Sequence, residues 1–175
     1  MNEEVKVETA AEMRDLGRRL AALLRAGDLI ILSGPLGAGK TTLTQGIGDG
    51  LGVRGPVTSP TFVIARVHPP ADRRSPGPAL VHADAYRLGS SLELDDLDLD
   101  ADTDTSVTVV EWGEGLAEGL AADRLEIEIE PAGAAGDSPD AVSGESEQPR
   151  TVRITGVGLR WQDARLTRAN VHNRL

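Results

Sequence analysis

Residues 29–41 have the sequence Leu-Ile-Ile-Leu-Ser-Gly-Pro-Leu-Gly-Ala-Gly-Lys-Thr, in which an apolar run is followed at once by a glycine-rich segment. From Gly34 to Thr41 this segment matches the phosphate-binding pattern G-x-x-x-x-G-K-[ST] at every fixed position. Its glycines let the backbone bend so that successive N–H groups face phosphate oxygens, and the dipole of the following helix favours the same anion. A glycine-rich turn that merely caps a helix is the alternative. Because a strand-like run precedes the pattern and a helix-like stretch follows it, we expect a nucleotide-binding protein.

The segments on either side of this loop predict the fold class. Leu29 to Leu32 form a short continuous apolar run, which is typical of a strand covered on both faces in a parallel sheet. The loop should lead into a helix from Lys40 to Leu51 that stops at Gly52. Three glycines inside this helix each cost about 1 kcal/mol relative to alanine, so packing against other elements must hold it. We expect an α/β protein, a single P-loop NTPase-like domain over residues 1–175 with a mixed, mostly parallel central sheet flanked by helices.

Further elements follow from capping signals and from the spacing of apolar residues. Thr9 to Glu12 fits a capping box, and apolar residues at helical spacing continue the first helix until Gly27. Strands are expected at residues 62–67, 80–83, 107–110, 124–130 and 151–155. The first two should form an antiparallel pair and the last two a half-exposed hairpin. The segment 131–149 is too poor in apolar residues to order itself, so we expect a disordered acidic insertion there, and a short basic helix at 161–174.

Composition limits the chemistry that this chain can support. Its 175 residues suffice for one domain with a real core, since chains of about 150 residues bury about two-thirds of their unfolded surface. No cysteine is present, and the three histidines are scattered without zinc spacing. The chemistry must therefore rest on oxygen ligands, phosphate and Mg²⁺. Neither a secretion signal nor an apolar run near 20 residues is found, so we expect a cytoplasmic protein with no membrane interaction.

The net charge of −10 is concentrated in two segments that lack lysine and arginine. Residues 92–104 contain seven acidic side chains and residues 131–149 contain four, so the rest of the chain, without these eleven charges, is near +1. Such a body lacks the basic stripe that binding to a phosphate backbone requires. Direct and tight binding of nucleic acid by this chain alone is therefore not expected.

Two predicted strands end in a carboxylate, Asp84 and Glu111. In a sheet of this kind both side chains could converge beside the phosphate loop. A carboxylate there holds Mg²⁺, directly or through water, or positions the water that attacks the γ-phosphate. An ordinary acid at a strand end is the alternative for each, and Asp84 could equally pair with Arg87. The division of roles between the two acids stays open.

Two further features lie where a nucleotide could be contacted. Ser59-Pro60-Thr61-Phe62 follows the phosphate-loop helix, at the position where a hydroxyl senses the γ-phosphate and Mg²⁺ in nucleotide switches; a serine-capped turn is the alternative. Trp112 directly follows Glu111. Its ring could pack near the nucleotide or a partner, or in the core.

These motifs together resemble the TsaE family. The resemblance rests on Gly34 to Thr42, Ser59 to Phe62, His82 to Leu88 and Glu111-Trp112, in this order and spacing. It spans roughly Thr9 to Ile129. It implies a small bacterial ATPase needed to make threonylcarbamoyladenosine beside the anticodon of tRNA. It also implies work with a TsaB and TsaD heterodimer, which ATP hydrolysis resets between turnovers, so that tRNA is reached only indirectly through the complex.

Carried over residue by residue, the resemblance implies a site for ATP and Mg²⁺. It assigns the ATP phosphates to Leu36, Gly37, Ala38, Gly39, Lys40 and Thr41, with Thr42, Thr61 and Trp112 also at the nucleotide. It assigns Mg²⁺ to Thr41 and Glu111, and catalysis to Lys40, Asp84 and Glu111. Thr9 and Ala10 resemble the part of the family that touches the base, and Arg150 a late basic residue near ATP.

Two other functions use the same loop. A small-molecule or nucleoside kinase would need an acceptor site and an arginine-rich lid, for which Arg73-Arg74 is the only candidate. A GTPase-like switch would want an N-K-x-D motif to read guanine, and the sequence contains none. Nucleoside-dependent ADP release, and competition between ATP and GTP, would separate these functions.

Overall fold

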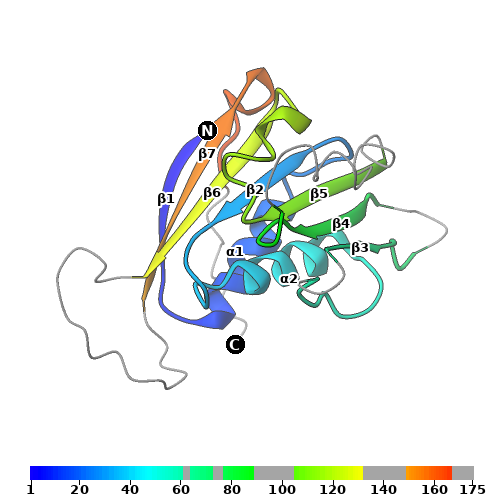
Figure 1. The fold of residues 1–175 in the computed structure, drawn as a ribbon, viewed down its shortest axis with the longest axis horizontal. Helices are drawn as coiled ribbons and strands as arrows, with labels where there is room; N and C mark the ends of the chain where they lie inside the picture. The colour runs from blue at the N-terminus through cyan, green and yellow to red at the C-terminus, as the bar shows by residue number, and fades with distance from the viewer. Residues whose placement is uncertain (61–63, 73–76, 89–104, 132–148, 167–175) are drawn as a thin grey trace, which may run out of the picture.

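The computed structural model describes residues 1–60, 64–72, 77–88, 105–131 and 149–166 (Figure 1). These residues form a seven-stranded sheet in the order β1-β7-β6-β2-β5-β4-β3. The strands are β1 (Asn2–Val7), β2 (Leu29–Ser33), β3 (Ala65–His68), β4 (Ala79–Asp84), β5 (Ser106–Glu111), β6 (Arg124–Pro131) and β7 (Arg150–Val157). The helices are α1 (Ala10–Ala21) and α2 (Lys40–Leu51), with short 3₁₀ turns η2 (Glu118–Leu120) and η3 (Leu159–Trp161).

The middle of the sheet is parallel and its margins are antiparallel. Strand β2 pairs in parallel with both β5 and β6, and β5 pairs in parallel with β4. Strands β3 and β7 run the other way, so β3–β4 and β6–β7 are antiparallel pairs, and β1 joins the edge at β7. The predicted fold class, the antiparallel pair and the hairpin are confirmed.

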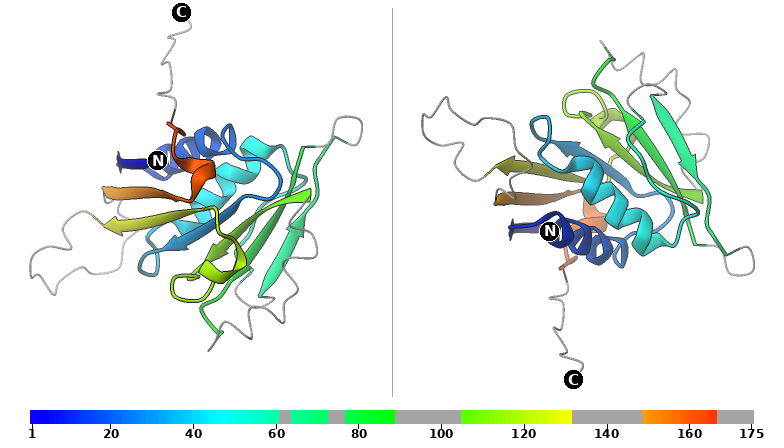
Figure 2. Two further views of the ribbon diagram at one scale, coloured as in Figure 1. Left: turned by 90° about the horizontal axis from the view of Figure 1, so that it is seen from above. Right: turned by 90° about the horizontal axis from the view of Figure 1, so that it is seen from below.

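Both helices lie over one face of the sheet (Figure 2). Their buried side chains, among them Met13, Leu16, Leu43 and Ile47, pack on the apolar residues of the central strands to form the main core. A smaller apolar cluster lies on the other face and is centred on Leu29, Ile31, Val81 and Val110, which explains why β2 and β5 are buried on both sides. Within the described residues, no helix is both long and apolar enough to cross a membrane.

Helix α2 has the predicted bounds, and its glycines have a packing reason. Gly46 and Gly50 face α1: a Cβ on Gly46 would overlap the backbone carbonyl of Arg14, and one on Gly50 would lie 2.5 Å from Cβ of Ala21. Gly17 of α1 faces α2 in the same way and leaves no room for a Cβ against the carbonyl of Leu43. The glycines therefore let the two helix backbones touch, which the helical pattern alone did not reveal.

Gly46→Ala is expected to destabilise the protein although alanine is the better helix former. The added methyl group overlaps backbone rather than a flexible side chain, so α1 must move and the core beneath it must repack, at a cost of about 1–3 kcal/mol. Because the overlap is with three backbone atoms of Arg14, we expect a cost in the upper part of that range, above the gain of about 1 kcal/mol in helix propensity. Urea unfolding followed by circular dichroism measures the difference. Gly119→Ala is the matched control, because nothing lies within 4 Å of its Cβ position. An unchanged unfolding midpoint for Gly46→Ala would contradict this account of the helix contact.

Several predicted boundaries differ from the structure. Thr9 caps α1 as predicted, and its Oγ1 accepts the N–H of Glu12 at 3.1 Å, but the helix ends at Ala21 rather than near Gly27. The chain leaves the helix there through two overlapping four-residue turns, in which the N–H groups of Leu23 and Leu24 bond to the carbonyls of Leu20 and Ala21. At the N-terminus, strand β1 was not predicted.

The predicted strand at 62–67 is also shifted. Residues 61–63 lie outside the described residues, and Ile64 has a φ of 69°, which no strand residue adopts. The backbone N–H of Ile64 bonds to the carbonyl of Pro60, and the carbonyl of Ile64 accepts the backbone N–H of Asp84. The strand therefore begins only at Ala65.

Near the C-terminus, η3 and turns take the place of a helix up to Leu166, and the rest of the predicted basic helix lies outside the described residues. Pro131, the first residue of the predicted insertion, instead ends β6 opposite Arg150. Residues 132–148 and the acidic run at 92–104 are outside the described part of the chain.

Candidate nucleotide site

The phosphate loop connects the end of β2 to the start of α2. Gly34, Gly37 and Gly39 have φ values of 136°, 78° and 109°, a backbone that side chains with a Cβ rarely adopt. Gly39 is the N-cap of α2, so the N–H groups at the start of the helix are directed at the loop. The sequence pattern and the backbone thus agree on an anion-binding loop.

Lys40 is buried at the base of this loop. Its Nζ donates to the carbonyl oxygens of Gly34 at 2.7 Å and Pro35 at 3.0 Å, and lies 3.7 Å from the centre of the Trp112 ring. Burial lowers the pKa of Lys40 below its usual value, and the carboxylates of Glu111 and Asp84 partly offset that effect. The ammonium group is therefore held between loop carbonyls, an aromatic face and two acids.

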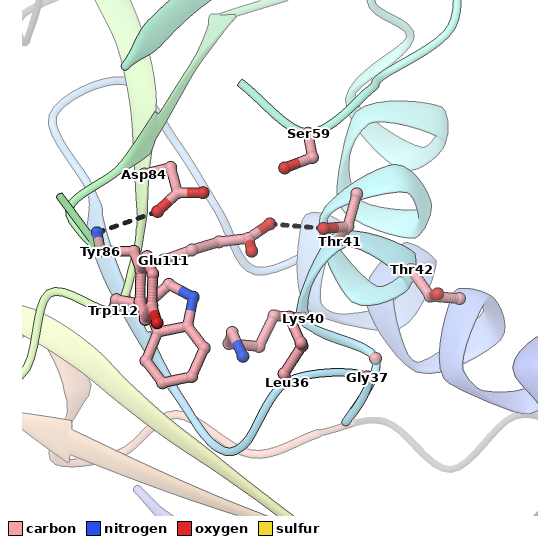
Figure 3. A pocket seen from close by; sticks show the side chains of 11 residues that line it. Leu36, Gly37, Lys40, Thr41, Thr42, Ser59, Asp84, Tyr86, Glu111 and Trp112 are labelled. Carbon is pink, nitrogen blue, oxygen red and sulfur yellow. Dashed lines mark hydrogen bonds between the residues drawn. The ribbon is translucent and has the colours of Figure 1, made fainter. Parts of the chain in front are cut away.

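The two strand-end acids converge beside the loop, as the sequence predicted. Asp84 and Glu111 occupy paired positions at the ends of β4 and β5, and both are buried. Glu111 Oε1 accepts the hydroxyl of Thr41 at 2.9 Å (Figure 3). Asp84 Oδ1 accepts the backbone N–H of Tyr86 at 2.9 Å. One hydroxyl and two carboxylates from three elements thus face the same space.

A cavity of about 380 Å³ lies between these groups. It is lined by Leu36, Gly37, Gly39, Lys40, Thr41, Thr42, Ser59, Asp84, Tyr86, Glu111 and Trp112. Its size is within the range of small-molecule pockets. Most of the predicted site residues therefore share one cavity, although Thr42 points away from Glu111 (Figure 3).

Ser59 and Tyr86 line the cavity and were not among the predicted site residues. Ser59 lies in the loop after α2 and points toward the space between Asp84 and Thr41 (Figure 3). Tyr86 is 66% exposed, and its ring lies 5.1 Å from that of Trp112 at an angle of 56°. The motifs Ser59 to Phe62 and His82 to Leu88 were the signals for these two residues.

Trp112 forms a wall of the cavity and is not a core residue. Its φ is 59°, a strained conformation for a tryptophan, and its backbone N–H bonds to the carbonyl of Leu32 at 2.8 Å. This backbone turns the ring away from the sheet and over the Lys40 ammonium. Strain of this kind gathers at functional sites, where the surrounding structure imposes it.

The remaining predicted residues lie outside the cavity lining or outside the described residues. Ala38 is in the loop with its side chain buried, and Thr9 and Ala10 begin α1. Arg150 starts β7, and its Cδ would be 3.9 Å from a Cβ on Gly39, so it lies against the loop. Thr61 falls outside the described residues, as do Arg73 and Arg74. Contacts of these residues with a nucleotide stay predictions.

The cavity has the donor set that Mg²⁺ takes in phosphate-loop proteins. Magnesium keeps several waters and is bound by one or two protein oxygens together with phosphate oxygens. The Thr41 hydroxyl and the Glu111 carboxylate, 2.9 Å apart, supply such a pair. Among the described residues there is no cluster of three or more histidines and acids that could hold a metal unaided. The chain's own groups thus fit a magnesium ion that arrives with a nucleotide.

A sheet of this topology, with a phosphate loop between a central parallel strand and the helix that follows, defines a fold of the P-loop class. The family model of the threonylcarbamoyl adenosine biosynthesis protein TsaE matches residues 7–137. The chain belongs to the TsaE family, as its motifs predicted.

Similar proteins agree with this assignment along most of the chain. The tRNA threonylcarbamoyladenosine biosynthesis protein TsaE of Streptomyces coelicolor is 61% identical over 153 residues, which cover 87% of this chain and 95% of that protein. The TsaE protein of Bacillus subtilis is 36% identical over 154 residues, 86% of this chain and 84% of that one. The crystal structure of YdiB from Bacillus subtilis superposes with a TM-score of 0.66 at 30% identity, and covers 92% of this chain and 89% of that one.

Proposed function

We propose that this protein is a Mg²⁺-dependent ATPase that acts in the threonylcarbamoyladenosine modification of tRNA, next to the anticodon, together with a TsaB and TsaD pair. The observation that carries the ATPase is the contact between the Thr41 hydroxyl and Glu111 Oε1 at 2.9 Å, beside a complete phosphate loop. The pathway rests on membership of the TsaE family and on relatives named for this modification.

The residues of the cavity divide the work of phosphate transfer. The N–H groups of the loop hold phosphate oxygens, and Lys40 turns its ammonium group from the loop carbonyls to the β- and γ-phosphates. Thr41 and Glu111 would hold the metal ion, which when bound would neutralise phosphate charge. Asp84 lies beside Glu111 in the register of β4 and β5, and its carboxylate orients the attacking water.

Charge and family membership both support the proposal of protein partners. With a net charge of −10, the chain has no surplus of basic groups with which to grip tRNA itself. A factor that acts through protein partners needs none. ATP hydrolysis would then reset the TsaB and TsaD complex between rounds of modification.

Steady-state ATP hydrolysis tests this proposal. The chain is assayed alone and with the purified TsaB and TsaD pair, each with and without Mg²⁺. We expect weak Mg²⁺-dependent turnover that rises when the pair is added. Turnover that is indifferent to the pair would contradict the partner role, and phosphate transfer to an added nucleoside would establish a kinase instead.

A further inference from the structure

His82 is a fully buried histidine that does not line the nucleotide cavity. It lies on β4 two residues before Asp84, so both side chains project from the same face of the strand. Its Nε2 lies 2.8 Å from Glu111 Oε1. The same oxygen accepts the Thr41 hydroxyl at 2.9 Å. Two side chains, one from β4 and one from α2, therefore meet on one atom of Glu111.

The direction of the His82 bond follows from the chemistry of its partner. An ionised carboxylate only accepts hydrogen bonds, so Nε2 must carry the hydrogen and donate it to Glu111. Among the described residues, the other ring nitrogen, Nδ1, is buried without a hydrogen-bond partner. A buried polar atom without a partner is costly, and an apolar side chain would fill this core position without that cost. The advantage of a histidine over an apolar residue here is therefore its hydrogen bond to Glu111.

We propose that His82 is a positioning residue that holds the Glu111 carboxylate against Thr41 for ATP hydrolysis. The inference rests on the proposed ATPase function. A glutamate has three rotatable side-chain bonds, and one hydroxyl contact leaves the carboxylate free to turn about it. A second donor from a different element fixes the group, as outer partners of metal-binding carboxylates do.

Substitutions of two lengths test this role. The amide nitrogen of glutamine can take the place of Nε2, whereas that of asparagine reaches only the place of Nδ1. We expect His82→Asn to lower kcat about 10- to 100-fold, the usual loss when such an outer partner is removed. The KM for ATP should stay within about threefold, because the loop and Lys40 hold the phosphates. We expect His82→Gln to restore most of the rate.

His68→Asn is the matched control. His68 is also buried, on the neighbouring strand β3, and its Nε2 likewise has no hydrogen-bond partner among the described residues. It does not line the cavity, so the same exchange there should leave kcat unchanged. A wild-type kcat in a folded His82→Asn variant would overturn the proposal. Equal losses in the Asn and Gln variants would do the same.

A spectroscopic readout on the unmodified chain separates the contact from the activity. In long-range ¹H–¹⁵N NMR spectra of the nucleotide-free protein, we expect His82 Nε2 to carry a hydrogen and its signal to shift in Glu111→Gln. A hydrogen on Nδ1 alone, with a bare Nε2, would overturn the inference even if ATP is hydrolysed. If the wild-type chain hydrolyses no ATP, the proposed function fails, while these spectra still decide whether His82 holds Glu111.

Discussion

Lys40→Ala should reduce ATP hydrolysis by at least about 100- to 1,000-fold, the loss expected when one donor to the developing charge of a transition state is removed. The ammonium group is already buried beside the place where the phosphates bind, between the carbonyls of Gly34 and Pro35 and the ring of Trp112. Among the residues that the structure describes, no other cationic side chain lines the cavity, so none of them can replace it. Steady-state turnover at saturating Mg²⁺ and ATP measures the loss.

The control for this prediction is unusually close, because the chain has only two lysines, Lys6 and Lys40. Lys6 is exposed on the edge strand β1, opposite Thr151. Lys6→Ala removes the same group at a surface site and should keep wild-type turnover. Retained turnover in Lys40→Ala would show that Lys40 is not needed for hydrolysis.

The same pair of lysines gives a test of binding that does not depend on turnover. Burial lowers the pKa of Lys40, so at a given pH more of its amine is neutral and nucleophilic than at its ordinary pKa. We expect ATP to protect Lys40, and not Lys6, from an amine-reactive reagent, as measured by peptide mass spectrometry. Equal labelling with and without ATP would show that the nucleotide does not cover Lys40.

The parts of the fold that the sequence predicted well depend on neighbours along the chain. The phosphate loop, the apolar run of β2 and the end of α2 at Gly52 are each specified within a few residues, and their bounds agree with the structure. Strand β1 was missed because Val5 and Val7 alternate with charged residues over too short a span. It is a strand only because β7 offers it an edge.

The features of the site that the sequence did not predict depend on contacts between distant segments. Asp84 and Glu111 could be predicted because carboxyl ends of parallel strands meet at one edge of a sheet. The role of His82 depends on the register that places Asp84 beside Glu111, and a histidine in a strand gives no hint of that register. The turn of the Trp112 ring over Lys40 follows from a φ of 59°, which no local motif specifies.

Glu111→Gln should lower kcat by about 100-fold or more while ATP stays bound, because a metal ion that polarises a phosphoryl oxygen contributes several kcal/mol to the transition state. Glutamine has nearly the same shape and can still accept from Thr41 and His82, so the variant removes the charge and little else. Glu111→Ala should lose at least as much. Binding of ATP, measured by titration calorimetry, should change little, because the loop and Lys40 hold the phosphates.

The dependence of turnover on Mg²⁺ concentration shows whether Glu111 holds the metal or directs the water. Because its Oε1 lies 2.9 Å from the Thr41 hydroxyl, we expect it to hold the metal, so Glu111→Gln should need about tenfold more Mg²⁺ for half-maximal turnover. Asp84→Asn should lower kcat at saturating Mg²⁺ without that shift. Glu114→Gln, an exposed change three residues along, is the control and should leave both quantities as in the wild type. If Asp84→Asn shifts the Mg²⁺ requirement and Glu111→Gln does not, the metal belongs to Asp84 and Glu111 directs the water.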